Sequence, residues 1–329
     1  MRYFLIYLTA NDMFSLSIDY LNIKNLIQYK AFEKKFEKKF EKNSETKITI
    51  KLILVMSLVK KLNFLQRKEL YKLIDLIQQN SHIFDLQQVI LKGNIGRDFS
   101  SVYCALNYLK DYLYPNPDDI VLIRNRSAYG AFKNGWFSDY INVLNHPKNN
   151  DVAIVGNTIN IYARDQNKKI CPHIQTYLYA AKWRDLDLLL AKNIFPGLKA
   201  KSNHEAIKYG ELKLSDIFLN TFAKKIMALC PQNLKVSKNL TLQQINELNQ
   251  ENNKDNLNLQ ISLKDIKSNN DYVANLPFKY KFPQYRRNIN ALCNRISFAL
   301  KSCLFNYQKN FKLSKNEKNI ISKISEFDE

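Results

Sequence analysis

A short glycine-containing turn, Asn94-Ile95-Gly96-Arg97-Asp98-Phe99, offers the clearest chemistry in the sequence. It follows the apolar run Val89-Ile90-Leu91 and precedes a helical pattern of apolar residues. A strand that enters such a turn and opens a helix presents free backbone N–H groups and the positive end of the helix dipole. Both suit an anion or a sugar nucleotide. An ordinary strand-to-helix turn with Asp98 as the helix cap fits the same residues, and the turn alone leaves both interpretations open.

The elements expected around this turn alternate along the chain. Strands are predicted at residues 3–8, 48–57, 88–92, 120–123, 152–155 and 176–180. Helices are predicted at 17–42, 62–79, 137–144, 183–192 and 205–229, the last interrupted near Tyr209-Gly210. This alternation predicts an α/β fold with a Rossmann-like, mostly parallel sheet flanked by helices, in which the first 125 residues form four strands with three crossovers. Thr9 and Asp12, after the first strand, would then face a ligand, although a plain polar turn fits them as well.

Further stretches follow the glycine turn in a recognisable order, at residues 119–132, 152–160 and 172–176. Together with the turn they resemble a family of bacterial polysaccharide glycosyltransferases of the rhamnan-synthesis and capsule type, over about residues 85–220. The resemblance implies a glycosyltransferase A-like fold. It also implies transfer of a sugar, with inversion, from a nucleotide-sugar donor to a cell-surface polysaccharide or lipopolysaccharide acceptor. The alternative is a non-catalytic, basic glycan-assembly or nucleic-acid-binding protein on a degenerate transferase domain.

The resemblance implies roles for particular residues. The fully matched Asn-x-Gly-x-Asp motif places a first set beside the nucleotide: Asn94, Gly96, Arg97 and Asp98. A second set would complete the nucleotide-sugar site: Asn125 and Ser127, which match the family's pattern, and Arg126, which departs from it. Glu211, in a Gly-Glu-x-x-Leu-Ser pattern, would be the catalytic base, although a first-turn Glu favoured by the helix dipole fits equally. His173 and Gln175, in Pro-His-x-Gln, would line the acceptor side, although a lone His beside a strand is often a core residue.

The residues that would compensate the charge of the leaving diphosphate differ from those usual in the glycosyltransferase A fold. Many enzymes of that fold carry Asp-x-Asp after the central strand to hold Mg²⁺ or Mn²⁺. Here the position reads Arg124-Asn125-Arg126-Ser127, while Asp118 and Asp119 precede the strand. We therefore predict metal-independent or weakly metal-dependent chemistry with no certain cofactor, in which Arg124 or Arg126 helps neutralise the diphosphate. The sequence leaves open a role for Mg²⁺ or Mn²⁺, and also a loss of activity in this copy.

The composition is strongly basic. Fifty Lys and Arg stand against 30 Asp and Glu in 329 residues, a net charge of +20. This excess attracts phosphorylated substrates, an anionic membrane surface or nucleic acid; nucleic acid is unlikely, because much of the excess is Lys in an Asn- and Ile-rich chain. Five separated cysteines without a C-x-x-C pair argue against a disulfide framework or a zinc site. No apolar run reaches the roughly 20 residues of a membrane span, so we expect a cytoplasmic protein, at most peripheral on the inner face of the cell membrane.

Composition also suggests a division of the chain. The resemblance implies that residues 1–235 form the glycosyltransferase A-like domain, with its nucleotide-sugar half to about residue 127 and its acceptor half from 128. Residues 236–272 are Asn-rich and predicted to be flexible, and 273–329 form a basic, helical C-terminal tail. Residues 32–42 repeat Phe-Glu-Lys-Lys, which gives an aromatic stripe on either a solvated helix or a basic helix lying on an anionic bilayer.

Overall fold

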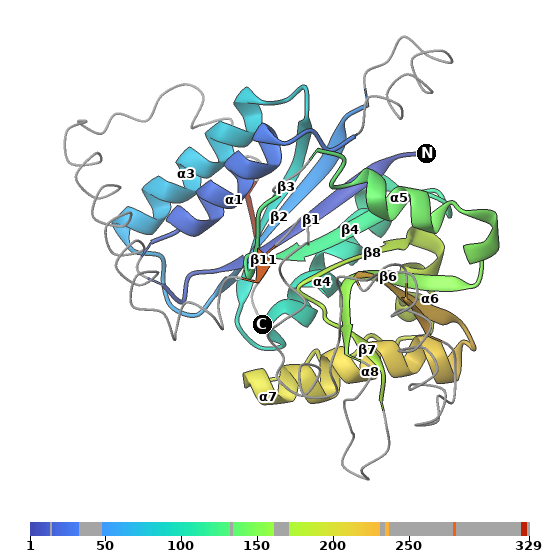
Figure 1. Ribbon diagram of the computed structural model, residues 1–329. Coiled ribbons are helices and arrows are strands. Elements are labelled where there is room, and N and C mark those ends of the chain that lie inside the picture. The colour runs from blue at the N-terminus through green and yellow to red at the C-terminus, as the bar shows by residue number, and fades with distance from the viewer. Residues whose placement is uncertain are drawn as a thin grey trace. The chain divides into compact units, whose positions relative to one another are not determined.

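A computed structural model describes residues 1–13, 15–32, 48–131, 134–160, 171–230, 234–236, 279–280 and 324–327. They form a mixed α/β fold in which a multi-stranded sheet is flanked by helices (Figure 1). The chain divides into two compact units. We call them the β1–β3 unit (residues 2–94, 123–136 and 277–329) and the β6–β9 unit (Met1 and residues 95–122 and 137–276). The repeat from residue 33 onward, nearly all of the Asn-rich segment and most of the basic tail lie outside the described residues, so their predicted structures stay predictions.

The β1–β3 unit is built on parallel strands. Its strands are β1 (Tyr3–Ala10), β2 (Ile50–Leu58), β3 (Phe84–Gly93), β12 (Ile324–Phe327) and the carboxyl end of β4 (Ile120–Asn125). They follow the order β4-β1-β2-β3-β12, and the pairs β1–β2, β2–β3 and β3–β12 are parallel. Short strands β5 (Ala128–Tyr129) and β11 (Lys279–Tyr280) pair antiparallel. The parallel arrangement predicted for the first strands is therefore confirmed in this unit.

Helices α1 (Ser17–Gln28) and α3 (Phe64–Gln79) lie side by side in this unit (Figure 1). The start of α3 is fixed by a capping box. The Asn63 side chain accepts from the Gln66 backbone N–H, and the Gln66 side chain accepts from the Asn63 backbone N–H. The apolar face of α3 is buried at 70, 73, 74 and 77. Burial of every residue of β1 from Tyr3 to Leu8 explains why that run is continuously apolar, as in a strand covered on both faces.

The β6–β9 unit has a mixed sheet. Its strands are β6 (Val152–Asn160), β7 (His173–Ile174), β8 (Leu178–Lys182), β9 (Lys225–Cys230) and β10 (Leu234–Val236). The order is β10-β9-β6-β8, with β7 also paired to β6. Strand β6 is parallel to β9 but antiparallel to β7 and β8, and β9 is antiparallel to β10. The predicted mostly parallel sheet is thus wrong for this unit, where most of the described pairs are antiparallel. Strand β9 ends at Cys230 and β10 begins at Leu234, a connection too short for the crossover that a parallel pair needs.

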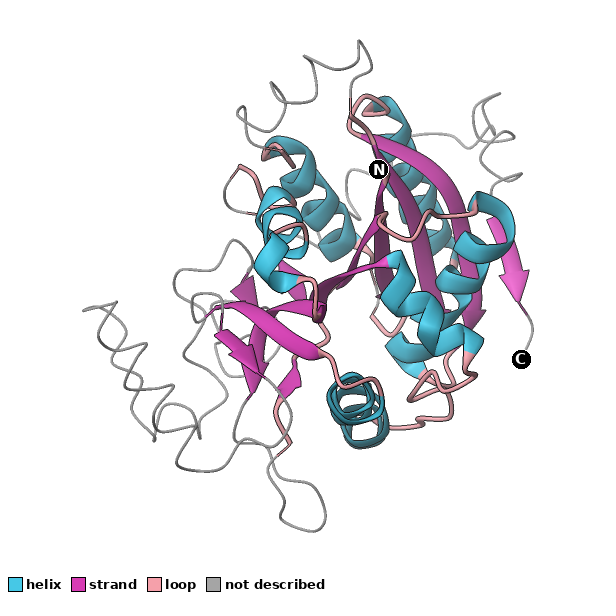
Figure 2. Cartoon of the chain, turned by 90° about the vertical axis from the view of Figure 1, so that its right-hand side faces the viewer, coloured by secondary structure: helices cyan, strands magenta, loops and turns pink. Residues whose placement is uncertain are grey.

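Most of the helices in the β6–β9 unit have buried residues. The helices of this unit are α4 (Arg97–Tyr108), η1 (Leu109–Leu113), α5 (Ser138–Leu144), η2 (Pro147–Asn149), α6 (Trp183–Ala191), α7 (Asn203–Glu205), η3 (Ala206–Glu211), α8 (Leu212–Asp216) and η4 (Ile217–Thr221). Figure 1 shows α7 to η4 as one continuous rod, which Figure 2 views nearly end-on. The segment η3 has π-helical geometry, a feature that is frequent at functional sites.

The long helix expected at 205–229 is correct only in its first part. The helical rod ends at η4, Ala223 adopts a left-handed φ of 51°, and Lys225–Cys230 is strand β9. Ile226, Met227 and Ala228 are buried there. A short buried apolar run has no periodicity that separates helix from strand, which explains the error.

Candidate functional site

The carboxyl ends of β1 and β4 meet at Arg126. Its backbone N–H donates to the carbonyl of Leu8 at 3.0 Å, and its guanidinium Nη1 donates to the carbonyl of Ala10. In the order β4-β1-β2-β3, the chain leaves β1 on one side toward β2 and later returns on the other side as β4. Ligands of open α/β sheets bind outside the carboxyl ends of the strands where the order reverses in this way. The residues that follow β1 and β4 are therefore candidates for a ligand site.

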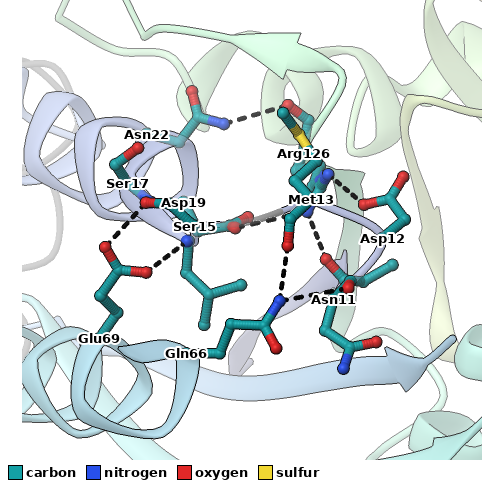
Figure 3. A network of polar contacts seen from close by, with 12 residues as sticks. Asn11, Asp12, Met13, Ser15, Ser17, Asp19, Asn22, Gln66, Glu69 and Arg126 are labelled. Atoms are coloured by element: carbon teal, nitrogen blue, oxygen red, sulfur yellow. Dashed lines mark hydrogen bonds and ion pairs between the residues drawn. The ribbon is translucent and has the colours of Figure 1, made fainter. Parts of the chain in front are cut away.

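Two carboxylates flank the Arg126 guanidinium from different sides (Figure 3). Asp12, in the loop after β1, forms an ion pair with Nη2. Asp19, on α1, has its Oδ2 atom 3.8 Å from Nη1. The Asp12 side chain is 49% exposed, whereas those of Arg126 and Asp19 are 8% and 0% exposed. Arg126 thus has a buried carboxylate on one side and a carboxylate open to solvent on the other.

Asp19 is held by a buried polar network. The Tyr7 hydroxyl donates to Asp19 Oδ1 at 2.9 Å. The Asn22 amide donates to the Tyr7 oxygen at 3.1 Å and to the Arg126 carbonyl at 3.2 Å. Burial raises the pKa of Asp19 above the usual value of an aspartic acid, and the Arg126 charge opposes that shift. Burial, reinforced by the Asp19 charge, also raises the pKa of Tyr7, which therefore remains a hydrogen-bond donor.

Asp19 should make the free energy of unfolding depend on pH. Because the pKa of Asp19 is raised in the folded protein, the native state binds its proton more tightly than the unfolded chain does. The resulting stabilisation is complete below the unfolded pKa of about 3.9 and is lost as the pH rises through the folded value. We therefore expect the stability of the protein, relative to Asp19→Asn, to fall as the pH rises from about 4 toward neutral.

Urea unfolding of the two proteins at a series of pH values measures this difference. Asp75→Asn is the matched control for the loss of one negative charge, because Asp75 lies on α3 of the same unit and accepts a bond from Gln79 at the surface. A stability difference between the protein and Asp19→Asn that stays constant with pH would contradict the expectation.

The loop after β1 is tied to α3, as Figure 3 shows. It is also tied to the end of β2. The Asn11 side-chain oxygen accepts from the backbone of Val59 at 2.7 Å. The Gln66 amide donates to the carbonyls of Asn11 and Met13. Farther along, Glu69 accepts from Ser15 Oγ and the Leu16 backbone at 2.7 Å each. Asp12 therefore lies between two residues whose backbone carbonyls are both fixed.

Most of the polar residues that build this network have no distinctive pattern in the sequence. The network includes Tyr7, Asn11, Asp19, Asn22, Gln66 and Glu69. Only the Asn63–Gln66 capping pattern carried a local signal, and that signal concerns the start of a helix.

The Arg124 side chain binds the loop that follows β4. Its side chain is fully buried, and Nη2 donates to the carbonyls of Ala128 and Gly130 at 2.7 and 2.6 Å. The guanidinium also lies 5.5 Å from the ring centre of Tyr7, within range of a cation–π contact. Arg124 is therefore oriented into the protein, and the prediction that Arg124 or Arg126 neutralises a diphosphate stays a prediction. Its neighbour Asn125 accepts from the backbone of Ser127 at 2.9 Å and shapes the same turn.

The glycine turn opens α4 as predicted, but its cap differs from the expected one. Gly96, with φ of 74°, is the N-cap, and Asp98 lies within the first turn, so the alternative with Asp98 as cap is wrong. A Cβ on Gly96 would approach the Leu198 carbonyl to 2.4 Å, so the turn requires glycine. Arg97 also has a positive φ, of 49°. Half-buried Asn94 belongs to the β1–β3 unit, whereas residues 96–98 belong to the β6–β9 unit.

Glu211 lies in a small polar cluster of the β6–β9 unit. Thr176 Oγ1 donates to its Oε2 atom at 3.2 Å. His173 Nε2 lies 3.4 Å from Oε1, and the side chains of His173 and Glu211 are 6% and 16% exposed. His173 Nδ1 donates to the Cys171 carbonyl at 3.1 Å, since a carbonyl can only accept. Thr176 therefore holds one oxygen of Glu211, and the His173 ring faces the other.

Gln175 lies beside this cluster on the chain but bonds elsewhere. Its Oε1 atom accepts from Thr158 Oγ1 at 2.6 Å, and its backbone N–H donates to the Thr158 carbonyl at 3.1 Å. The Thr158 hydroxyl lies 2.9 Å from that of Tyr177, whose oxygen accepts from the Asn157 amide at 3.0 Å. Gln175 therefore anchors the segment between β7 and β8 to the end of β6.

Phe99 connects the glycine turn with Glu211. The ring is 4% exposed, and a Cβ on Gly210 would come within 2.2 Å of Phe99 Cε2. Gly197 faces the same ring, because its Cβ would approach Phe99 Cγ to 2.7 Å. The start of α4 and the Glu211 cluster thus belong to one packed region of the β6–β9 unit.

Comparison of the described residues with the prediction gives two groups. One joins Arg126, Asn125 and Ser127 in the β1–β3 unit, and the other joins Glu211 and His173 in the β6–β9 unit.

Within the described ranges, no three His, Cys, Asp or Glu residues are grouped to hold a metal ion. In the same part of the chain, no helix combines the length and apolar character needed to cross a bilayer. A scan against models of known protein families gives no match to the chain, and a search of curated proteins gives none either.

Proposed function

We propose that this protein is a glycosyltransferase that moves a sugar from a nucleotide-sugar donor to a cell-surface polysaccharide or lipopolysaccharide acceptor. The observation that carries the proposal is the meeting of two separate motifs at Glu211. Pro172-His173-Ile174-Gln175 and Gly210-Glu211 are far apart in sequence, yet the His173 ring lies 3.4 Å from one carboxylate oxygen of Glu211. Thr176, which follows the first motif directly, donates to the other oxygen. An oriented, slightly exposed carboxylate fits the role of a general base.

The proposed chemistry is a single displacement. Glu211 takes the proton of an acceptor hydroxyl while the hydroxyl oxygen forms a bond to the anomeric carbon of the donor sugar. The bond from that carbon to the diphosphate breaks, and its electron pair leaves with the nucleoside diphosphate. Attack from the side opposite the leaving group inverts the anomeric centre. Thr176 positions the carboxylate through its hydrogen bond, His173 packs against the second oxygen, and neither touches the reacting atoms.

Arg126 supports the donor half of the proposal. It lies at the carboxyl ends of β1 and β4, where the strand order reverses, and a guanidinium is a preferred partner of a diphosphate. Asn125 and Ser127 shape the turn around it. We assign Asn94, Gly96, Arg97 and Asp98 to the nucleotide on the resemblance alone. The chemistry proposed needs no metal, and Mg²⁺ or Mn²⁺ remains a variable of the experiment.

A thermal-shift screen with UDP, GDP, CDP and dTDP, each with and without Mn²⁺, tests the proposal. We expect one nucleotide to raise the melting temperature, because a ligand at 100 times its Kd stabilises a folded protein by about 2.7 kcal/mol. Asp98→Ala should remove the shift, whereas Asp111→Ala, on η1 of the same unit, should keep it.

No shift with any nucleotide would contradict the proposal. The non-catalytic interpretation would then be the better one, since the net charge of +20 favours an anionic partner in either case. For the active enzyme we propose a cytoplasmic location, with the basic surface resting on the inner face of the cell membrane, where a lipid-linked acceptor is available.

A further inference from the structure

Arg126 has a fixed side and an exchangeable side. On the fixed side, its backbone bonds to Leu8, Nη1 bonds to the Ala10 carbonyl, and buried Asp19 lies 3.8 Å from Nη1. The Asn22 amide holds the Arg126 carbonyl as well. These partners belong to β1 and α1, so they keep the guanidinium in place whatever happens on its other side.

On the exchangeable side, Nη2 meets Asp12, whose side chain is 49% exposed. The backbone on both sides of Asp12 is fixed, because Gln66 holds the carbonyls of Asn11 and Met13. Asn11 is itself fully buried and bonded to Val59. Rotation of the Asp12 side chain about its own bonds therefore breaks this ion pair while the backbone bonds on both sides of Asp12 stay in place.

We propose that Asp12 occupies the place of a ligand phosphate on Arg126 and that the diphosphate of the donor displaces it. Carboxylate and phosphate oxygens accept from a guanidinium in the same geometry. The Asp12 side chain is 49% exposed, so its carboxylate returns to water when the ion pair breaks, and a diphosphate brings more than one negative charge to Arg126. The proposal rests on the proposed function, since it takes the ligand to be the nucleoside diphosphate of the donor.

The exchange makes Asp12 a specificity residue. A weakly charged anion gains no more from Arg126 than Asp12 already does, so Asp12 excludes it, whereas a diphosphate gains enough to displace the carboxylate. Without ligand, Asp12 also keeps the Arg126 charge compensated on its solvent side.

The sign of the effect of Asp12 on affinity separates this proposal from the alternatives. If Asp12 bonded a ribose hydroxyl or a metal ion, its removal would weaken binding. If it competes with the ligand, removal of its charge strengthens binding. From the free energy of an ion pair whose carboxylate is half exposed, we expect Asp12→Asn to bind the diphosphate about two- to fivefold more tightly.

The experiment is a titration of the full chain with inorganic pyrophosphate and with each of UDP, GDP, CDP and dTDP, at constant ionic strength. The variants are Asp12→Asn, Asp12→Ala, Arg126→Gln and, as the matched control, Asp85→Asn. Asp85 is a 47% exposed carboxylate of the same unit and pairs with Lys51 at 3.3 Å. We expect tighter binding in both Asp12 variants, loss of binding in Arg126→Gln and no change in Asp85→Asn. Melting temperatures without ligand establish that each variant is folded.

Unchanged or weaker binding by the folded Asp12 variants, with the wild-type protein binding a nucleotide, overturns the inference and leaves the proposed function standing. Tighter binding by Asp85→Asn as well would show a general charge effect and would also overturn the inference. If neither the wild-type protein nor the Asp12 variants bind pyrophosphate or any nucleotide, the proposed function fails together with the inference.

Discussion

Glu211→Gln is expected to lower the rate of sugar transfer by about 10²–10⁴-fold, the usual contribution of a general base. Glutamine keeps the size of the side chain and retains an oxygen that can accept from Thr176, but it cannot take a proton from the acceptor hydroxyl. Nucleotide binding and the melting temperature should change little, because the loss falls on the chemical step. The measurement is turnover of the nucleotide sugar whose nucleotide stabilises the protein.

The matched control is Glu205→Gln, at the end of α7 on the same helical rod. Glu205 accepts from the backbone of Lys201 at 2.7 Å at the surface and lies outside the Glu211 cluster. Turnover by Glu205→Gln should equal that of the wild-type protein. Full turnover by Glu211→Gln, with binding intact, would exclude Glu211 as the base and move the search to another carboxylate.

The strands of the β1–β3 unit could be predicted because their signal is local. A strand buried on both faces must be apolar along its whole length, and residues 3–8 satisfy this condition without reference to any distant residue. Gly96 was identified for a similar reason, since a strand followed by glycine and a helical pattern describes the turn by itself. Both features could be predicted from the residues within about ten positions on either side.

The polar network around Arg126 could not be predicted because its members meet only in the folded chain. Asp12 and Arg126 are separated by 114 residues, and Asn22 and Arg126 by 104. Asp19 and Asn22 occupy helix positions where polar residues are common, so nothing in the local pattern marks them as buried. The distinction between a solvated aspartate and a fully buried one depends on which strand the helix covers, and that is a property of the tertiary fold.

The packing of Phe99 links the glycine turn to the backbone at Glu211. Gly210 directly precedes Glu211, and its hydrogen faces the Phe99 ring where any side chain would collide. Gly197 faces the same ring. The position of the backbone at Glu211 is therefore set by a side chain from the first turn of α4. This coupling can be measured as a free energy of unfolding.

Phe99→Ala is expected to cost about 3–5 kcal/mol, because it leaves a cavity in a well-packed region. Gly210→Ala is expected to cost about 1–3 kcal/mol, because its Cβ would lie 2.2 Å from the ring. In the double variant the new methyl group enters the space that the ring has left. The double variant should therefore lose less free energy of unfolding than the two single variants lose together. We expect the difference to be about 0.5–3 kcal/mol, as measured by urea unfolding.

Gly156→Ala provides the control for this coupling. Its Cβ would lie 2.2 Å from Ile174 Cγ2, so its own cost should resemble that of Gly210→Ala. It collides with a different side chain, however, and Phe99→Ala opens no space for it. Its effect should therefore add to that of Phe99→Ala within about 0.5 kcal/mol. Simple additivity for Phe99→Ala and Gly210→Ala would show that the two residues are not in contact, and that the turn at Gly96 does not set the position of Glu211.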